Sequence, residues 1–530
     1  MVRPEEQEAQ IFKSQTIRQA SFVLGGVALL RLILRFFVVV LIARRFGVGR
    51  EADVYFLATT IPVAMAASNR QAINYAFIPV YTEYNIEREE EEGWKMVSIT
   101  LNHSMMILLA FTVLYFLLAP LVFDLVAPGF TPEDRYRATQ LSRLISPIFI
   151  SFALFAYCEG ILYSRHHFTT TSFATLFVSL GTLLGIVFLA DSLGIFGVGL
   201  GLLGGYIVQA VIPLIPFRHY RKRLSMILDW GHGGFRKFYV QIPNILWIQM
   251  CIIAVLVTDF ALATTLGSGN VSAFQYCCTI VGIVPTIAQA SLLGPLYPRI
   301  SERIVRKEFQ ELKALILLFF RAVTFVTIPV VMGVMVLRVP IVTLLLERGS
   351  FTREATELTA HILLFTAPGM VFVPLSSVFF LVFLANNRSR LLAKLSGIFI
   401  ISNLLLCLFF MQFLGLAGIA LGSTLLYLGQ IFVCGYLVQR DIGNLGMRDL
   451  TGILSKISVA TLLAASCLWA GLHFSAGMVI TTTNFSLLLR LLVLGLIGGL
   501  AYFLTCYVLR VEEIGKVLEQ LRGYRKGLAE

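Results

Sequence analysis

Apolar runs long enough to cross a lipid bilayer recur along the whole of this 530-residue chain. An α-helix rises about 1.5 Å per residue, so a hydrocarbon core of about 30 Å needs roughly 20 mostly apolar residues. We predict about 14 such spans, each placed to within several residues: roughly 20–44, 54–81, 97–119, 143–164, 170–190, 195–217, 238–262, 271–292, 314–337, 361–384, 392–413, 416–438, 453–472 and 487–508. In lipid, an isolated apolar run satisfies its backbone hydrogen bonds only as a helix. The pattern therefore predicts an all-α polytopic membrane protein.

Composition and charge exclude a soluble globular chain, because 57% of the residues are hydrophobic and only 14% are charged. The basic residues fall mainly on alternate loops if both termini lie in the cytoplasm, which is the bias that orients helices in membranes. The net charge of +12 is thus mainly a sign of topology, with an attraction to anionic lipid as a second contribution. A nucleic-acid partner is not expected, since the sequence has no soluble basic module.

Neither a catalytic site nor a metal site is predicted. The eight cysteines all fall within predicted spans without the spacing of a zinc site, so we interpret them as small hydrophobic residues. A glycosyltransferase acting on isoprenoid phosphates would need a catalytic loop, and the chain has no Asp-x-Asp pair and no large loop to hold one. The sequence favours a transporter, and no cofactor is expected.

The most informative architectural feature is an internal repeat. The segment LGIFGVGLGLLGGYIVQ, Leu193–Gln209, matches LGLAGIALGSTLLYLGQ, Leu414–Gln430, at a spacing of 221 residues, with three glycines, a tyrosine and a glutamine in common. Further pairs occur in the same order at nearly the same spacing: FGVG (Phe46–Gly49) with LGSG (Leu266–Gly269), PVYTE (Pro79–Glu83) with PRISE (Pro298–Glu302), and GFTPE (Gly129–Glu133) with GSFTRE (Gly349–Glu354). Six predicted helices separate the copies, and because six is even the two halves have parallel topology.

The repeat predicts two six-helix lobes around a central cavity, followed by two further helices, which is an architecture typical of alternating-access transporters. The predicted segments are a cytoplasmic N-terminal segment 1–19, an N-lobe 20–217, a cytoplasmic linker 218–237, a C-lobe 238–438, a helix pair 453–508 and a cytoplasmic tail 509–530. This organisation places a substrate site near the middle of the membrane.

Two arginines, Arg31 and Arg35, interrupt the apolar first span within the run LLRLILRFFVVV. Arg31 lies roughly 17 Å from either end of a helix over 20–43, which is too far for its side chain to reach an interface readily. Arg35 is at i+4, so both guanidinium groups share one helix face. Arg70 interrupts the second span in the same way, whereas the corresponding helices of the second half contain no arginine.

These arginines predict a cationic cavity. Each costs roughly 2.5 to 3.5 kcal/mol at the centre of a membrane helix, and lipid offers nothing to offset that cost. We therefore expect Arg31, Arg35 and Arg70 to face a cavity and to bind an anionic substrate, with phosphate as the group that guanidinium binds best. The alternative is that they pair with internal acids or carbonyl groups and only hold helices together.

Several motifs carry a family resemblance over about Leu30–Gln439. They are ARRFGVGREADVYF (Ala43–Phe56), AFIPVYTEY (Ala76–Tyr84), APGF (Ala127–Phe130), SGNVSAFQY (Ser268–Tyr276), LLERGSFT (Leu345–Thr352) and GLAGIALG (Gly415–Gly422). In this order and spacing they resemble the MurJ/MviN lipid II flippase family, within the multidrug/oligosaccharidyl-lipid/polysaccharide exporter superfamily. The resemblance implies an alternating-access flippase in the bacterial inner membrane, which carries an undecaprenyl-diphosphate-linked cell-wall precursor from the cytoplasmic to the outer leaflet. It also implies that the last two spans form a groove for the lipid tail; membrane lipids are the other expected partners, and a monomer is expected.

The chain departs from the family pattern in its arginines. Relative to FGVG, the two positions that usually carry arginine in the first helix hold Leu32 and Val38, and a further family arginine is absent from YCCT, Tyr276–Thr279. Two alternatives therefore stay open: a flippase for another lipid-linked polysaccharide repeat unit, and a small-molecule or drug antiporter of the same superfamily. A cationic-drug antiporter should have an acidic or aromatic cavity rather than one with arginines.

Acidic and polar residues complete the predicted sites. Asp53 matches the acidic residue that follows the family's F-G-x-G motif and is predicted to order a gate, with a solvated helix N-cap as the alternative. Asp259 corresponds to an acidic family position, and together with Asn403 it is predicted to couple transport to sodium, protons or the membrane potential. The alternative for Asp259 is a buried acid that is paired within the protein. Glu159 is expected to be an interfacial charge.

Overall fold

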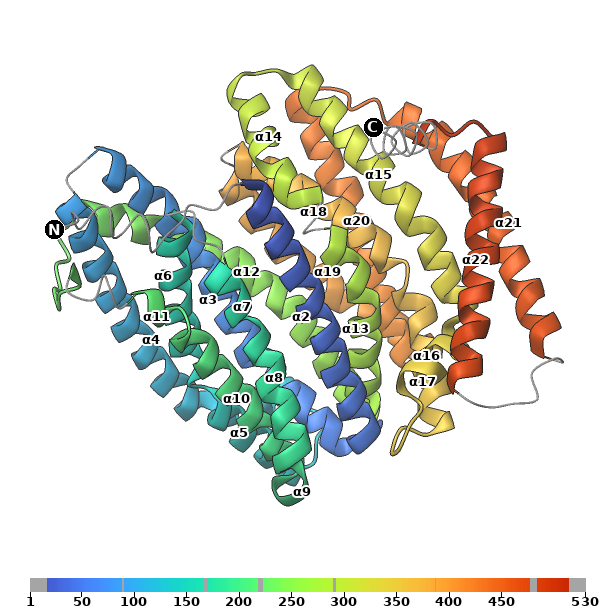
Figure 1. The fold of residues 1–530 in the computed structure, drawn as a ribbon, viewed down its shortest axis with the longest axis horizontal. Coiled ribbons are helices and arrows are strands. Elements are labelled where there is room, and N and C mark those ends of the chain that lie inside the picture. The colour runs from blue at the N-terminus through green and yellow to red at the C-terminus, as the bar shows by residue number, and fades with distance from the viewer. Residues whose placement is uncertain are drawn as a thin grey trace. The chain divides into compact units, whose positions relative to one another are not determined.

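The computed structural model describes residues 17–87, 90–164, 169–217, 223–288, 292–386, 388–476 and 484–513, and all regular structure in these ranges is helical (Figure 1). Within these described ranges, thirteen helical stretches are long and apolar enough to cross a membrane, and each coincides with one predicted span. The remaining predicted span, 54–81, falls within α3 (Arg50–Glu87), a helix of 38 residues with a more polar centre. The prediction of an all-α polytopic membrane protein is confirmed.

The chain divides by packing into two compact units, Met1–Ser272 and Ala273–Glu530. The helices of the first unit, besides α3, are α2 (Ile17–Phe46), α4 (Glu90–Val126), α5 (Pro132–Ile145), α6 (Ile148–Ser164), α7 (Thr169–Ala174), α8 (Leu176–Leu184), the π-helix Gly185–Leu189, α9 (Ala190–Leu193), α10 (Ile195–Val211), α11 (Leu214–Phe217) and α12 (Gly233–Thr265). The remaining helices are α13 (Asn270–Ala288), which begins at the end of the first unit, α14 (Gly294–Val305), α15 (Phe309–Val336), α16 (Arg338–Leu346), α17 (Arg353–Thr366), α18 (Gly369–Ala385), α19 (Ser389–Leu414), α20 (Leu416–Ile442), α21 (Met447–Ala476) and α22 (Asn484–Val508).

The boundary between packing units differs from the boundary that the repeat predicts. Helix α12 packs against α3 and belongs to the first unit, whereas the repeat makes it the first helix of the C-lobe 238–438. The packing units are defined by contacts, whereas the predicted lobes are defined by the sequence repeat. The packing units therefore do not test the predicted segment boundaries, which stay predictions. Most of the N-terminal segment 1–19 and of the tail 509–530 lies outside the described residues.

The core of the first unit is an aromatic cluster where α3, α6 and α12 meet. Phe77 of α3 stacks on Tyr81 with ring centroids 5.4 Å apart, and it contacts the edge of Tyr157 of α6 at 5.1 Å. Phe238 of α12 lies against both Phe77 and Tyr157, and all four side chains are fully buried. Aromatic pairs in these geometries contribute about 0.5 to 1.5 kcal/mol each beyond the burial of their area. The cluster therefore fixes α3, the helix that carries Arg70, against α6.

The predicted repeat is present in the local backbone of both copies. Gly194 has φ 56° and ψ −134°, and Gly415 at the matching position has φ 56° and ψ −128°. This is a conformation that only glycine adopts readily, and in both copies it ends one helix and begins the next. Thr131 and Thr352, also at matching positions, cap α5 and α17 through their side-chain hydroxyls. The sequence repeat therefore reflects one helical unit that the chain uses twice.

Glycines also let the backbones of α8 and α10 touch. A methyl group on Gly201 would lie 2.4 Å from the carbonyl oxygen of Gly181 and 2.7 Å from the Cα atom of Gly185. In the second copy, a methyl group on Gly422 would lie 2.8 Å from the backbone nitrogen of Cys407 on α19. Lipid provides no hydrophobic driving force for helix association, so helices in a membrane associate through close packing. Small residues at a crossing allow the two backbones to pack closely. These glycines thus hold the helix pair at the end of each repeat together.

We expect Gly201→Ala to destabilise the protein by about 1 to 3 kcal/mol, because the added methyl group meets backbone atoms that cannot move aside. The matched control is Gly204→Ala on the same helix, where a methyl group would meet nothing within 4 Å. That control should be neutral or slightly stabilising, since alanine favours the helix by up to about 1 kcal/mol. Thermal melting in detergent measures both variants; equal melting temperatures would contradict the close contact.

Candidate functional site

Helix α2 presents two different faces to the space around the protein. Arg31 lies near the middle of the helix, and both Arg31 and Arg35 are exposed. Leu29, Ile33 and Phe37 are also exposed, by 56%, 44% and 54%. Residues two apart on a helix point about 200° away from each other, so these apolar side chains lie roughly opposite the arginines. One face of α2 therefore suits lipid, and the other suits a water-filled space.

Two of the arginines of α2, Arg31 and Arg35, are not neutralised by an acid within the part of the chain that the structure describes, whereas Arg45 of the same helix pairs with Asp191. Neither Arg31 nor Arg35 forms an ion pair there. Arg31 lies within electrostatic reach of Arg35, Arg70 and Glu159. Arg31, Arg35 and Arg70 therefore form one cluster. The guanidinium groups of Arg31 and Arg35 remain able to bind an anion.

Arg70 of α3 has a different environment. Its Nε donates a hydrogen bond to Oε2 of Glu159 on α6 at 2.8 Å, and its Nη2 donates to Oε1 of the same carboxylate. Asn74, one turn along α3, donates to Oε2 at 2.7 Å, and the Arg70 guanidinium lies 5.0 Å from the centre of the Phe155 ring. A bidentate pair of this kind is strong and directional. For Arg70, the alternative of an internal ion pair thus describes the geometry, while its role in binding a substrate stays a prediction.

The expectation for Glu159 is wrong. Its side chain is only 2% exposed, so it is not an interfacial charge in contact with solvent. The packing of α6 on α3 brings it to Arg70, a partner 89 residues away in the sequence. Burying a carboxylate costs several kcal/mol unless a partner and further hydrogen bonds compensate it. Arg70 and Asn74 supply both, which explains why the chain carries a glutamate at this position.

Asp53 is fully buried at the N-terminal end of α3. Its Oδ2 accepts a hydrogen bond from the backbone N–H of Gly269 at 2.6 Å, and its Oδ1 accepts one from the backbone N–H of Ser272 at 2.7 Å. These amides belong to the turn and first residues of α13, where a carboxylate satisfies otherwise unpaired N–H groups and the helix dipole. Asp53 therefore caps a helix other than its own, and the alternative of a solvated N-cap is wrong.

The turn that Asp53 binds also contacts the FGVG segment. Gly269 has a φ of +87°, and a methyl group there would lie 2.7 Å from the side chain of Val48. FGVG and LGSG are the paired segments of the repeat, so two copies of the same turn meet at this point. Asp53 has no acidic counterpart in the second copy, because Ala273 occupies the matching position. The two turns are related by the repeat, but only the first copy carries a carboxylate at this position.

The two residues of the predicted coupling site lie in different packing units. Asp259 is 4% exposed on α12, and Asn403 is fully buried on α19. The Asn403 side-chain oxygen accepts a hydrogen bond from the Cys407 thiol at 3.8 Å, one turn along the same helix. Their joint role stays a prediction. Among the described residues, no group of three or more histidine, cysteine, aspartate and glutamate side chains could hold a metal ion.

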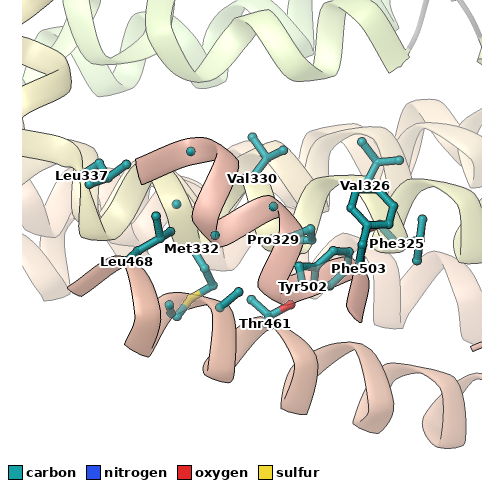
Figure 2. A pocket seen from close by; sticks show the side chains of 16 residues that line it. Phe325, Val326, Pro329, Val330, Met332, Leu337, Thr461, Leu468, Tyr502 and Phe503 are labelled. Carbon is teal, nitrogen blue, oxygen red and sulfur yellow. Dashed lines mark hydrogen bonds between the residues drawn. The ribbon is translucent and has the colours of Figure 1, made fainter. Parts of the chain in front are cut away.

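An apolar pocket of about 370 Å³ lies where α15, α21 and α22 come together (Figure 2). Phe325 and Val330 line it from α15, Leu468 from α21, and Tyr502 from α22. The Tyr502 hydroxyl donates to the carbonyl oxygen of Phe325 at 2.8 Å, so the polar atom of the tyrosine is satisfied away from the apolar wall. Gly495, Gly498 and Gly499 of α22 also line the pocket. A hydrocarbon chain fits such a lining better than a polar group does.

The sequence model described as "Lipid II flippase MurJ" matches residues 42–489, which is most of the chain. The chain belongs to the lipid II flippase MurJ family. The probable lipid II flippase MurJ of Vibrio cholerae is 23% identical over 517 residues, covering 94% of this chain and 97% of that protein. The probable lipid II flippase MurJ of Buchnera aphidicola is 24% identical over 445 residues, covering 82% of this chain and 86% of the relative. The family is thus one of transporters rather than enzymes.

Solved structures support the MurJ-like fold. A structure described as lipid II flippase MurJ in an inward closed conformation superposes with a TM-score of 0.77 at 22% identity, covering 93% of this chain and 100% of the other. A multidrug resistance MATE family transporter in an inward-facing conformation superposes with a TM-score of 0.66 at 13% identity, covering 80% of this chain and 98% of the other. At these identities the likeness concerns the fold alone.

Sequence reasoning did not find the Arg70–Glu159–Asn74 network of this MurJ family member. Asn74 lies one turn after Arg70 on α3, so their side chains share a helix face, and this spacing was the one available signal. Tyr206 of α10 is also buried within electrostatic reach of the three arginines. These contacts join helices that are far apart in sequence, which a local pattern does not predict.

Proposed function

We propose that this protein is an alternating-access flippase that moves an undecaprenyl-diphosphate-linked cell-wall precursor, lipid II or a close relative, from the cytoplasmic to the outer leaflet of a bacterial inner membrane. Membership of the MurJ family supports the class of substrate. The observation that carries the proposal within this chain is the basic face of α2, where Arg31 and Arg35 have no acidic partner among the described residues. Both termini lie in the cytoplasm in this proposal.

The basic face suits a diphosphate. A diphosphate that leaves water must have its hydration replaced, and charge-assisted hydrogen bonds from guanidinium groups are strong enough to do so. Arg31 and Arg35 are one helical turn apart, so their two guanidinium groups can bind oxygens of neighbouring phosphates. Arg70 lies in the same cluster, but its pairing with Glu159 leaves no net charge on that pair, so Arg31 and Arg35 supply the positive charge. A cavity with this charge disfavours cationic drugs, which argues against the antiporter alternative.

The isoprenoid tail needs an apolar path, which the pocket between α15, α21 and α22 supplies in this proposal. The tail comes from lipid that is equally apolar, so the pocket accepts it through close packing rather than through the hydrophobic effect. The pocket lies on the last two helices, which the architecture adds to the two repeated halves. Separate parts of the chain therefore handle the head group and the tail.

Asp53 acts as a gate in this proposal, since its two hydrogen bonds hold the start of α13 and would have to break when this end opens. Asp53→Asn replaces one carboxylate oxygen with an amide donor that faces backbone N–H groups, so we expect a loss of transport of at least about tenfold, equal to the roughly 1.5 kcal/mol of one hydrogen bond to a charged group. The matched control is Glu51→Gln, an exposed carboxylate in the same helical turn. Transport by Asp53→Asn that equals the control would contradict the gate.

Asp259 and Asn403 couple transport to an ion in this proposal. We expect Asp259→Asn to change the dependence of transport on sodium, pH or membrane potential without abolishing substrate binding, because a neutral side chain no longer offers a charged oxygen ligand. Flipping assays in proteoliposomes under imposed ion gradients measure this. An ion dependence identical to that of the native protein would remove Asp259 from the mechanism.

Complementation tests the function as a whole. The chain is expressed in a conditional mutant that lacks its lipid II flippase, and in parallel in a mutant that lacks a flippase for a lipid-linked polysaccharide unit. We expect rescue of the first mutant. Rescue of the second mutant alone would instead favour the alternative glycan, which the displaced family arginines at Leu32 and Val38 keep open.

A further inference from the structure

The segment Arg223–His232, which precedes α12, lies along the first turns of α4. The Asn102 side-chain amide of α4 donates to the carbonyl oxygens of Ser225 at 3.0 Å and Ile227 at 3.1 Å, and the Ser98 hydroxyl accepts from the backbone N–H of Ser225 at 3.2 Å. The segment is thus tied to α4 through its backbone.

Three large apolar side chains of this segment are exposed. Met226 is fully exposed, Leu228 is 58% exposed and Trp230 is 59% exposed. The ring of Trp230 is nevertheless held, because it contacts the buried His103 ring edge-on with centroids 4.4 Å apart. Three large apolar groups on one short non-helical segment are unfavourable in water.

The depth of the segment in the membrane follows from α4. Residues 93–100 of α4 are largely buried, and exposed apolar side chains begin with Met106 at 45% and Ile107 at 41%. Asn102, which binds the segment, lies about one helical turn before them. Segment 223–232 is thus tied to α4 close to the predicted cytoplasmic end of the span 97–119, and we infer that it lies near the boundary between the hydrocarbon core and the head groups. In that placement Trp230 is at the level where tryptophan is enriched in membrane proteins.

A second apolar pocket opens between α4, α6 and this segment. It has a volume of about 380 Å³ and is lined by Leu101, Asn102, Met105, Met106, Leu154, Met226 and Leu228. Arg223 is exposed at the start of the segment, with its guanidinium 6.0 Å from the centre of the Trp94 ring. Trp94 lies eight residues before Asn102 on α4, so Arg223 is about 12 Å along the helix from the pocket. An apolar pocket with an arginine at this separation is complementary to a lipid with a negatively charged head group.

We propose that this site binds an anionic phospholipid of the surrounding bilayer, with an acyl chain in the pocket and the phosphate group on Arg223. Lipid of the same leaflet reaches the site without entering the basic cluster at Arg31 and Arg35. The inference is independent of which glycan the protein carries. It makes the segment before α12 a lipid-bound element rather than a loop in the cytoplasm.

Quenching of Trp230 by brominated lipid tests the site. The other three of the four tryptophans, Trp94, Trp247 and Trp469, are replaced by phenylalanine in the full-length chain. The protein is reconstituted into vesicles of phosphatidylcholine and phosphatidylglycerol, with bromine on the acyl chains of one lipid or the other at constant composition. We expect about a fivefold preference for phosphatidylglycerol at Trp230, which corresponds to about 1 kcal/mol for one interfacial arginine.

Two further variants make the result decisive. Arg223→Gln should remove the preference while quenching itself remains, and Arg299→Gln, an exposed arginine of the second unit, should leave it unchanged. Met226→Ser should weaken quenching by both lipids, and it removes no internal packing because this side chain is fully exposed. Equal quenching by both brominated lipids in the unmodified segment would overturn the anionic site, and an absence of quenching would overturn the placement in the membrane.

Discussion

Replacing both Arg31 and Arg35 with alanine is expected to abolish flipping and to leave thermal stability unchanged or raised. Neither side chain forms an ion pair with a described residue, so their removal leaves no buried acid unpaired. An arginine within a membrane span costs up to roughly 2.5 to 3.5 kcal/mol, a cost that a water-filled space lowers, and alanine removes what remains of it together with the phosphate ligand. Activity and stability should therefore move in opposite directions, which is the behaviour of a binding site rather than of a structural pair.

The experiment compares a flipping assay with thermal melting in detergent on the same double variant. The matched control is the Leu29→Ala and Ile33→Ala double variant, which has the same spacing on the apolar face of α2. Arg31→Lys is a second control, because lysine keeps the charge but loses the planar fork and should be impaired more than charge alone predicts. A double alanine variant that melts much earlier yet retains specific activity would show that these arginines are structural.

Arg70→Met is expected to destabilise the protein by about 3 to 5 kcal/mol, the usual cost of leaving a buried charge without its partner. Glu159 is 2% exposed, and without Arg70 only the Asn74 amide would remain on it. The reverse change, Glu159→Gln, should cost less, because the Arg70 side chain is 27% exposed and water can reach it. The stability effect at Arg70 is thus the opposite of the effect expected at Arg31 and Arg35.

A double-variant comparison isolates this pair. Arg70→Met combined with Glu159→Leu removes both charges, and we expect its melting temperature to lie closer to the native value than that of Arg70→Met alone. Thermal melting of the three variants in detergent measures the coupling. If Arg70→Met melts like the native protein, the bidentate contact contributes nothing to folding and Arg70 returns to being a candidate ligand for the substrate.

Much of the fold is determined locally, and the sequence alone predicts it. The transfer of apolar runs into lipid depends on composition and length, so thirteen predicted spans coincide with helices of the structure. The turns at Gly194 and Gly415 require positive φ, a property of single residues, and the repeat at 221 residues places them correctly. The polar centre of α3 was also evident, since Arg70 interrupts an apolar run.

Only the tertiary structure decided which polar groups meet. The periodicity of a helix places residues on a face, but it does not say which other helix covers that face. Glu159 was therefore expected at an interface, whereas the packing of α6 on α3 buries it against Arg70. Asp53 is predicted to order a gate, with a solvated helix N-cap as the alternative, and the sequence does not show that its partners are backbone amides more than 200 residues away at Gly269 and Ser272. The same packing covers Arg70 and leaves Arg31 and Arg35 uncovered, because a charge in a membrane helix is tolerated only beside a partner or a water-filled space, and the choice between these depends on the neighbouring helices.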